Sequence, residues 1–157
     1  MKPVSGTALD GLIEAVRTRV PDTGIVHRTD ETLDSDPGSY LLLLRLRSPL
    51  LVRIGKRESR LPSGLYVYSG SAKGPGGLKA RLGRHLRGNG QLRWHIDQIT
   101  AHADDRAGLA FRSLTECDLT ARLLECSSFC VPVPGFGSSD CSTCRSHLIR
   151  FQASPED

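Results

Sequence analysis

The sequence predicts an α+β domain in which a small, mostly antiparallel β-sheet is flanked by helices. Three apolar runs of strand length follow one another between residues 40 and 68, and the short connections between them favour antiparallel pairing. Segments with helical spacing of apolar residues stand before and after these runs and do not alternate with them. This order of elements is typical of α+β architecture.

The N-terminal part predicts a helix and a linker. Residues 8–20 carry leucine, isoleucine and valine at helical spacing, and Pro21 follows directly. Residues 22–37 are acidic and polar and predict a linker, with one short strand at residues 25–27. We therefore expect residues 1–36 to be an appendage, residues 37–152 to form the functional domain, and residues 153–157 to be a tail.

Five further segments predict strands. Residues 40–47 are continuously apolar at first, which is typical of a buried strand, and residues 50–54 and 64–68 follow with partial alternation. Their short connections predict hairpins or a meander. Residues 109–114 and 146–152 are expected to add two further strands.

Three helices are expected after the first strands. Residues 78–87 follow a glycine-rich turn and form an amphipathic helix, and residues 94–102 form a shorter one. The buried stripe of the first helix consists of Leu78, Leu82 and Leu86. A third helix begins at Glu116, where Thr115 and Asp118 have the spacing of a capping box.

Positive charge is concentrated in the middle of the chain. Between residues 37 and 96 there are twelve Lys and Arg against one acid, Glu58, so this zone has a net charge of 12 − 1 = +11. Such a zone predicts an anionic partner, and nucleic acid fits better than a membrane because no long apolar face accompanies the charge. A solvated basic surface is the alternative.

The chain shows no membrane or secretion signal, and its cysteines are odd in number. No apolar stretch approaches the ~20 residues of a transmembrane helix, and the N-terminus does not resemble a signal peptide, so we expect a cytoplasmic protein. All five cysteines follow residue 116. This usage argues against a disulfide framework and leaves buried thiols or a metal site.

Five residues in order along the chain offer the groups that phosphodiester cleavage needs. They are Tyr40, Tyr68, Arg81, His85 and Glu116. Cleavage requires an oriented water, neutralisation of the phosphoryl oxygens and help for the leaving oxygen. Arg81 and His85 lie four positions apart, so their side chains project from one face of the predicted helix. Each residue also has an ordinary structural reading, such as a strand tyrosine, a surface arginine or a helix-start glutamate.

The two tyrosines set a condition for this chemistry. A phenol has a pKa near 10 and acts as a base at neutral pH only where a metal or cation lowers that pKa. The basic surroundings of Tyr40 and Tyr68 are of the kind that lowers a phenol pKa, although composition alone favours the ordinary structural role for each tyrosine.

Together these residues resemble the GIY-YIG nuclease superfamily. Gly38-Ser39-Tyr40 matches the first triplet of that family and Tyr68-Ser69-Gly70 the second, and Arg81, His85 and Glu116 follow in the family order. Longer stretches resemble its Uri-type branch, whose domains stand alone or are fused to an endonuclease III-like protein. These stretches are residues 64–72, 74–78, 94–97, 116–117, 135–141 and 146–148. The resemblance covers about residues 37–151.

The resemblance implies a metal-dependent endonuclease acting on nucleic acid, expected to be DNA, with a three-stranded antiparallel sheet flanked by helices. It implies that Tyr40 acts as general base or positions the water, assisted by Tyr68. Arg81 would bind the scissile phosphate, His85 would assist proton transfer, and Glu116 would hold one Mg²⁺ or Mn²⁺. Association with DNA-repair enzymes is a further implication.

Three features depart from the family pattern. The gap between the two triplets is longer than usual. Both triplets carry serine where the family name has isoleucine. Many members have an asparagine after the metal-binding glutamate, whereas the single asparagine of this chain, Asn89, precedes it. A nucleic-acid-binding module without catalysis is therefore an alternative.

Further basic residues are candidates for binding the nucleic-acid backbone. They are Lys73, Lys79, Arg84, Arg87 and His95. Trp94, next to His95, can either stack on a base or anchor a helix in the core.

The C-terminal region contains a candidate zinc motif, Cys141-x-x-Cys144-x-x-His147. Its spacing suits zinc, with Cys117 or Asp140 as a fourth ligand. The alternative is that these side chains serve in packing. If zinc is bound, a zinc-stabilised interaction domain is another interpretation of the chain.

Overall fold

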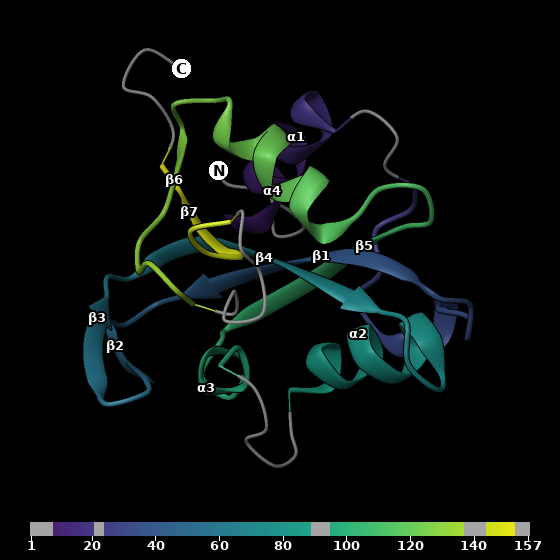
Figure 1. The fold of residues 1–157 in the computed structure, drawn as a ribbon, viewed down its shortest axis with the longest axis horizontal. Helices are drawn as coiled ribbons and strands as arrows, with labels where there is room; N and C mark the ends of the chain where they lie inside the picture. The colour runs from purple at the N-terminus through teal and green to yellow at the C-terminus, as the bar shows by residue number, and fades with distance from the viewer. Residues whose placement is uncertain (1–7, 21–23, 89–94, 137–143, 153–157) are drawn as a thin grey trace, which may run out of the picture.

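The fold is an antiparallel sheet with helices on both faces (Figure 1). The computed structural model describes residues 8–20, 24–88, 95–136 and 144–152. The helices are α1 (Ala8–Arg19), the 3₁₀ helix η1 (Asp30–Thr32), α2 (Gly77–Arg87), α3 (Asp97–Thr100) and α4 (Glu116–Leu124). The strands are β1 (Gly38–Leu46), β2 (Leu50–Ile54), β3 (Arg57–Leu61), β4 (Gly64–Ala72), β5 (Asp105–Phe111), β6 (Phe129–Cys130) and β7 (Leu148–Phe151).

The main sheet has five strands in the order β5-β1-β4-β7-β6, and every neighbouring pair is antiparallel. The predicted α+β class is confirmed. The sheet is larger than the three strands that the family resemblance implied, because β7 pairs with residues 65–68 of β4 and β6 then pairs with β7. β2 and β3 form a separate two-stranded hairpin.

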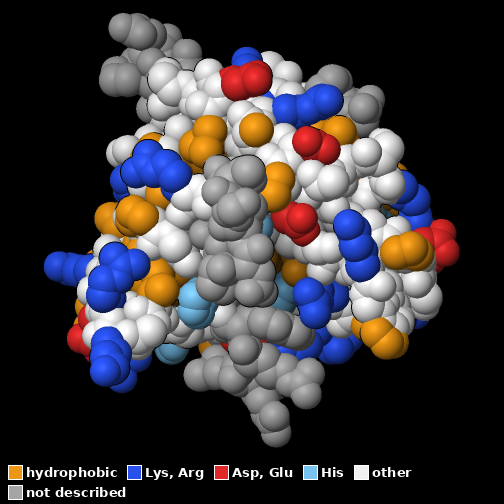
Figure 2. All heavy atoms as spheres, in the orientation of Figure 1, with side chains coloured by type: hydrophobic (Ala, Val, Ile, Leu, Met, Phe, Trp, Pro, Cys, Tyr) orange, Lys and Arg blue, Asp and Glu red, His pale blue; other side chains and the backbone are white. Residues whose placement is uncertain are grey.

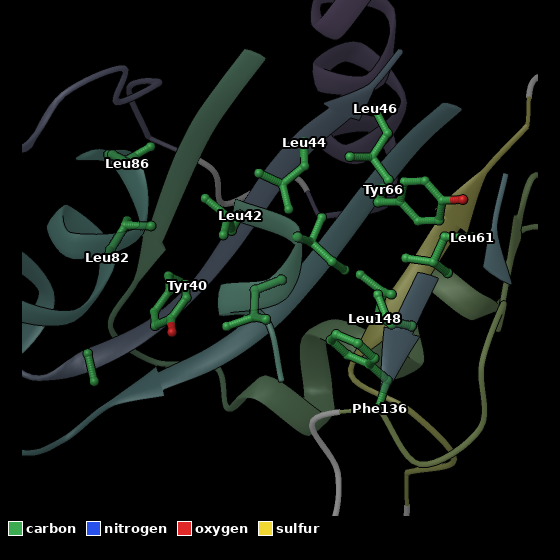
Figure 3. Packing of buried hydrophobic residues seen from close by; sticks show 14 of the residues in the cluster. Tyr40, Leu42, Leu44, Leu46, Leu61, Tyr66, Leu82, Leu86, Phe136 and Leu148 are labelled. Atoms are coloured by element: carbon green, nitrogen blue, oxygen red, sulfur yellow. The ribbon is translucent and has the colours of Figure 1, made fainter. Parts of the chain in front are cut away.

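Alternating side chains of β1 divide the core between the two faces of the sheet. Leu41 and Leu43 pack with residues of α1 and α4, whereas Tyr40, Leu42 and Leu44 pack with residues of α2 and α3. Figure 3 shows the second of these clusters, with Tyr40 and Leu42 on the side of β1 that faces α2. Because both faces are covered, β1 is apolar on consecutive positions, as its sequence predicted.

The N-terminal helix lies against the sheet. Leu9, Leu12 and Val16 of α1 are fully buried in the cluster that includes β1 and β5. In the following segment the predicted strand at residues 25–27 is reduced to one bridge, in which His27 pairs with Gly108 of β5.

The meander predicted for the first three apolar runs is wrong. The apolar runs at residues 40–47, 50–54 and 64–68 do not form a meander, because β1 pairs directly with β4 along its whole length. The run at residues 50–54 pairs instead with β3, which the sequence did not predict. The sequence of β3, Arg-Glu-Ser-Arg-Leu, is mostly polar and exposed, so it lacks the apolar alternation of a half-buried strand.

Two further boundaries differ from prediction. The helix expected at residues 94–102 is a single turn, α3, and Trp94 lies outside the described residues. The strand expected at residues 109–114 is β5, which begins four residues earlier and ends at Phe111.

Helix α2 is confirmed with its predicted stripe, since Leu78 and Leu82 are fully buried and Leu86 nearly so. It ends at Arg87 and is capped by Gly88, whose φ of 71° is in the left-handed region that glycine favours. The capping box at the start of α4 is also confirmed: the amide of Asp118 donates to Thr115 Oγ1, and its carboxylate accepts from the Thr115 amide. Within the described residues, no helix has the length and apolarity needed to cross a membrane.

Candidate active site around Tyr40 and His85

The central strands β1 and β4 place two phenols on one face of the sheet. Tyr40 is opposite Gly70 and Leu42 is opposite Tyr68, so the two tyrosines are diagonal neighbours on the α2 side. The ring of Tyr40 lies over Gly70, where a Cβ atom would overlap the ring and hydroxyl. Glycine in the second triplet therefore makes room for the phenol of the first.

Helix α2 brings His85 between these phenols. Tyr40 Oη and His85 Nε2 form a hydrogen bond of 3.0 Å. The imidazole centroid lies 5.7 Å from that of Tyr40 and 6.4 Å from that of Tyr68, which meets it edge-on. Tyr40 is 1% exposed and His85 2% exposed, so this pair is shielded from bulk water.

Asp97 of α3 lies on the other side of the imidazole. Its Oδ1 is 3.8 Å from His85 Nδ1. Arg84 holds the same carboxylate with two hydrogen bonds of 2.8 and 3.2 Å. The carboxylate favours a proton on Nδ1, and we assign the tautomer in which Nε2 is free to accept from the Tyr40 hydroxyl.

Burial keeps His85 neutral. Burial is the main cause that lowers the pKa of His85 to about 4. The charge of Asp97 opposes this shift, and the charges of Arg84 and Arg81 add to it. At neutral pH the imidazole is therefore uncharged, and its unprotonated nitrogen can accept a proton.

The expectation that the basic surroundings lower the pKa of the phenols is wrong. Burial raises the pKa of Tyr40 well above its ordinary value and that of Tyr68 to about 12, and in both cases the opposing effect of Arg81 is smaller. Removal of a phenol from water disfavours the phenolate more than one guanidinium favours it. Both phenols are therefore protonated at neutral pH.

Arg81 and Glu116 complete the group that the sequence singled out. Both are partly exposed, and Arg81 Nη1 donates to the carbonyl of Ser71 over 3.0 Å. The charge of Arg81 lowers the pKa of Tyr40 and of Tyr68, and that of Glu116 raises both, so the two charges lie near both phenols. All five predicted catalytic residues thus converge from β1, β4, α2 and α4.

The residues predicted to bind the nucleic-acid backbone differ in their exposure to solvent. Lys73, Lys79 and Arg87 are exposed. Arg84, by contrast, is only 18% exposed in its side chain, and its guanidinium faces Asp97. The ring of His95 packs against that of Phe136, with 5.4 Å between the two ring centroids.

Basic side chains gather on two sides of the same face of the molecule (Figure 2). One group lies over α2 and the loop before it, whose exposed basic residues are Lys73, Lys79 and Arg87. The other belongs to the β2–β3 hairpin and has four exposed basic side chains against one exposed acid. Its members are Arg53, Lys56, Arg57 and Arg60, and the acid is Glu58, which pairs with Arg53.

A group that can bind a metal lies beside this site. Cys117, Cys144 and His147 place their ligand atoms within 4.8 Å of one another. Two of the three were predicted as zinc ligands, and Cys117 was considered as a fourth. Cys141 and Asp140 lie outside the described residues.

Sequence reasoning missed the role of Asp97. A signal was available, because Asp97 is the first carboxylate after a segment of 38 residues, 59–96, that has none. A carboxylate that becomes buried is usually paired, and the many bases of the preceding segment offer partners.

Comparison with known proteins gives a family. No curated protein and no solved structure matches the chain significantly. The family described as a domain of unknown function, DUF123, matches residues 39–157, a range that includes all five residues around Tyr40 and His85 as well as the Cys/His group. The chain therefore belongs to the DUF123 family.

Proposed function

We propose that this chain is a metal-dependent endonuclease of the GIY-YIG type that hydrolyses phosphodiester bonds in DNA. The observation that carries the proposal is the 3.0 Å hydrogen bond between Tyr40 and a neutral, buried His85, with Arg81 and Glu116 beside them. These groups supply a proton path, a phosphate clamp and a carboxylate ligand in one place.

The raised phenol pKa values decide how the base works. Tyr40 is protonated at neutral pH, so it does not act as a phenolate base. It acts instead as a proton relay between water and His85. A water bound beside the phenols gives its proton to Tyr40 Oη while the Tyr40 proton moves to His85 Nε2. The oxygen of the water bonds to phosphorus, the opposite P–O bond breaks, and the leaving oxygen takes a proton from solvent. Asp97 stabilises the imidazolium that forms.

Arg81 is the clamp for the phosphate. It is partly exposed, and its charge acts on both phenols, so a phosphoryl oxygen bound there lies next to the proton path. Arg84 has a positioning role in this scheme, because its two hydrogen bonds hold Asp97 behind His85.

Two metals suit two different ligand sets. Mg²⁺ is commonly held by one or two carboxylates and completed by water and substrate phosphate, which fits the partly exposed Glu116. Bound there, Mg²⁺ or Mn²⁺ would neutralise charge on the phosphate and leaving oxygen. The two thiols and one imidazole of Cys117, Cys144 and His147 suit zinc.

A second candidate is a nucleic-acid-binding module without catalysis. It is favoured by the 1% exposure of Tyr40, which leaves its hydroxyl little access to water in the free protein. The basic groups on α2 and on the hairpin serve either function, because both require contacts with phosphates.

The test is cleavage of a labelled panel of single-stranded, duplex and branched DNA and RNA in Mg²⁺, Mn²⁺ or EDTA. The proposal expects cutting that requires the metal and is reduced, together with binding, by Arg81→Ala. Salt-sensitive binding without cutting across the whole panel would favour the non-catalytic module.

A further inference from the structure

The Cys/His group is assembled from distant parts of the chain. Cys117 stands in the first turn of α4, whereas Cys144 and His147 precede β7. Cys117 Sγ is 4.0 Å from His147 Nε2. His147 is 7% exposed, and both cysteines are partly buried and have no disulfide.

The spacing is close to that of a tetrahedral zinc site. Zinc bonds of about 2.3 Å to sulfur and about 2.0 Å to nitrogen separate ligand atoms by roughly 3.5 to 3.8 Å. Ligand atoms within 4.8 Å of one another reach this spacing by small side-chain rotations. Thiolates and imidazole are ligands that zinc prefers over Mg²⁺, which binds oxygen.

Hydrogen bonds connect the Cys/His group to β4, which carries Tyr68, and to α4, which carries Glu116. On β4, the residue after Tyr68 is Ser69, whose amide donates to the carbonyl of His147 over 3.0 Å. The Ser69 hydroxyl is 2.5 Å from that of Thr120 in α4. Thr120 in turn donates to the carbonyl of Glu116 over 2.8 Å, and Glu116 is the neighbour of Cys117.

We propose that zinc bound by Cys117, Cys144 and His147 is a positioning site that fixes the first turn of α4 to the segment before β7, which Ser69 joins to β4. The metal joins the same segments that the hydrogen bonds of Ser69 and Thr120 already connect. It thereby holds Glu116 at a set distance from Tyr68. The existence of the zinc site is independent of the proposed function, whereas its effect on Glu116 rests on that function.

The first experiment measures metal in the full chain purified without chelator. The inference expects about one zinc per chain, and, after exchange into cobalt, the thiolate-to-cobalt absorption band of a sulfur-ligated site. Cys117→Ser and Cys144→Ser should both lose this band and lower the melting temperature. Cys126→Ser and Cys130→Ser are the matched controls, since these cysteines lie outside the group, and both should retain metal.

The second experiment tests positioning. Cys117→Ser should raise the Mg²⁺ concentration for half-maximal cleavage by about tenfold, in the range found when a supporting contact of a metal ligand is lost. The affinity of Cys117→Ser for DNA in the absence of Mg²⁺ should equal that of Cys130→Ser. A general structural defect would instead weaken both DNA binding and the response to Mg²⁺.

The outcomes separate the inference from the proposed function. Wild-type protein without zinc or a cobalt–thiolate band, or peptide mapping that shows a Cys117–Cys144 disulfide, overturns the site. Zinc content that is unchanged in Cys117→Ser also overturns it. A protein that holds zinc but never cleaves refutes the nuclease and leaves the site standing, and cleavage with an unchanged Mg²⁺ requirement in Cys117→Ser refutes positioning alone.

Discussion

Replacing Tyr40 with phenylalanine tests the proton path at a single atom. The ring still fills its place over Gly70, while the 3.0 Å hydrogen bond to His85 is lost. His85 Nε2 is then left in a buried site without this partner, which costs about 1 to 3 kcal/mol of unfolding free energy. Loss of a positioned proton carrier should lower the single-turnover cleavage rate by roughly 10²- to 10⁴-fold.

Tyr66→Phe is the matched control. Tyr66 lies on the same face of the sheet, is fully buried, and donates its hydroxyl to the Pro62 carbonyl over 2.5 Å. It should lose about 1 kcal/mol of stability and no cleavage rate. Denaturant titration and quenched single-turnover cleavage measure the two quantities. A Tyr40→Phe rate within threefold of wild type, or an equal loss of rate in Tyr66→Phe, would refute the assigned role of the Tyr40 hydroxyl.

Three further predictions concern His85, Gly70 and the basic hairpin. Because the pKa of His85 is about 4 in the folded protein and 6.5 unfolded, its stabilising effect is complete above pH 6.5 and is lost as the pH falls towards 4. The loss amounts to about 3 kcal/mol at most, and denaturant titrations across this range should show it in wild type and not in His85→Asn. Gly70→Ala should cost about 1 to 3 kcal/mol because its Cβ overlaps the Tyr40 ring, whereas Gly74→Ala, with open space around it, should change the melting temperature little. Arg60→Ala, exposed on β3, should weaken DNA binding and reduce the slope of log affinity against log salt by about 0.9, and an unchanged slope in fluorescence anisotropy would exclude a phosphate contact there.

Local patterns were sufficient for the elements that carry the site. The leucine stripe of α2 and the capping box of α4 depend on residues three or four positions apart, and both are present as predicted. The five candidate catalytic residues also came from the sequence, through their chemistry and order.

Contacts between distant residues could not be predicted in this way. Strand β3 exists because it pairs with β2, and its polar sequence has little strand character of its own. The approach of Asp97 to His85 depends on how α3 packs against α2, and the meeting of Cys117 with His147 joins residues 30 positions apart. The direction of the phenol pKa shifts was wrong for the same reason, because the depth of burial is a property of the whole fold.

The most direct test of the central claim compares wild type with Glu116→Ala on the best-cleaved DNA of the panel. Affinity is measured without metal by fluorescence anisotropy, and the single-turnover cleavage rate is measured in Mg²⁺. We predict nearly equal affinities and no detectable cleavage by Glu116→Ala, since the carboxylate serves the metal and the basic groups bind the backbone. Equal cleavage rates for the two proteins would contradict the assignment of Glu116, and the absence of metal-dependent cleavage by wild type would contradict the nuclease itself.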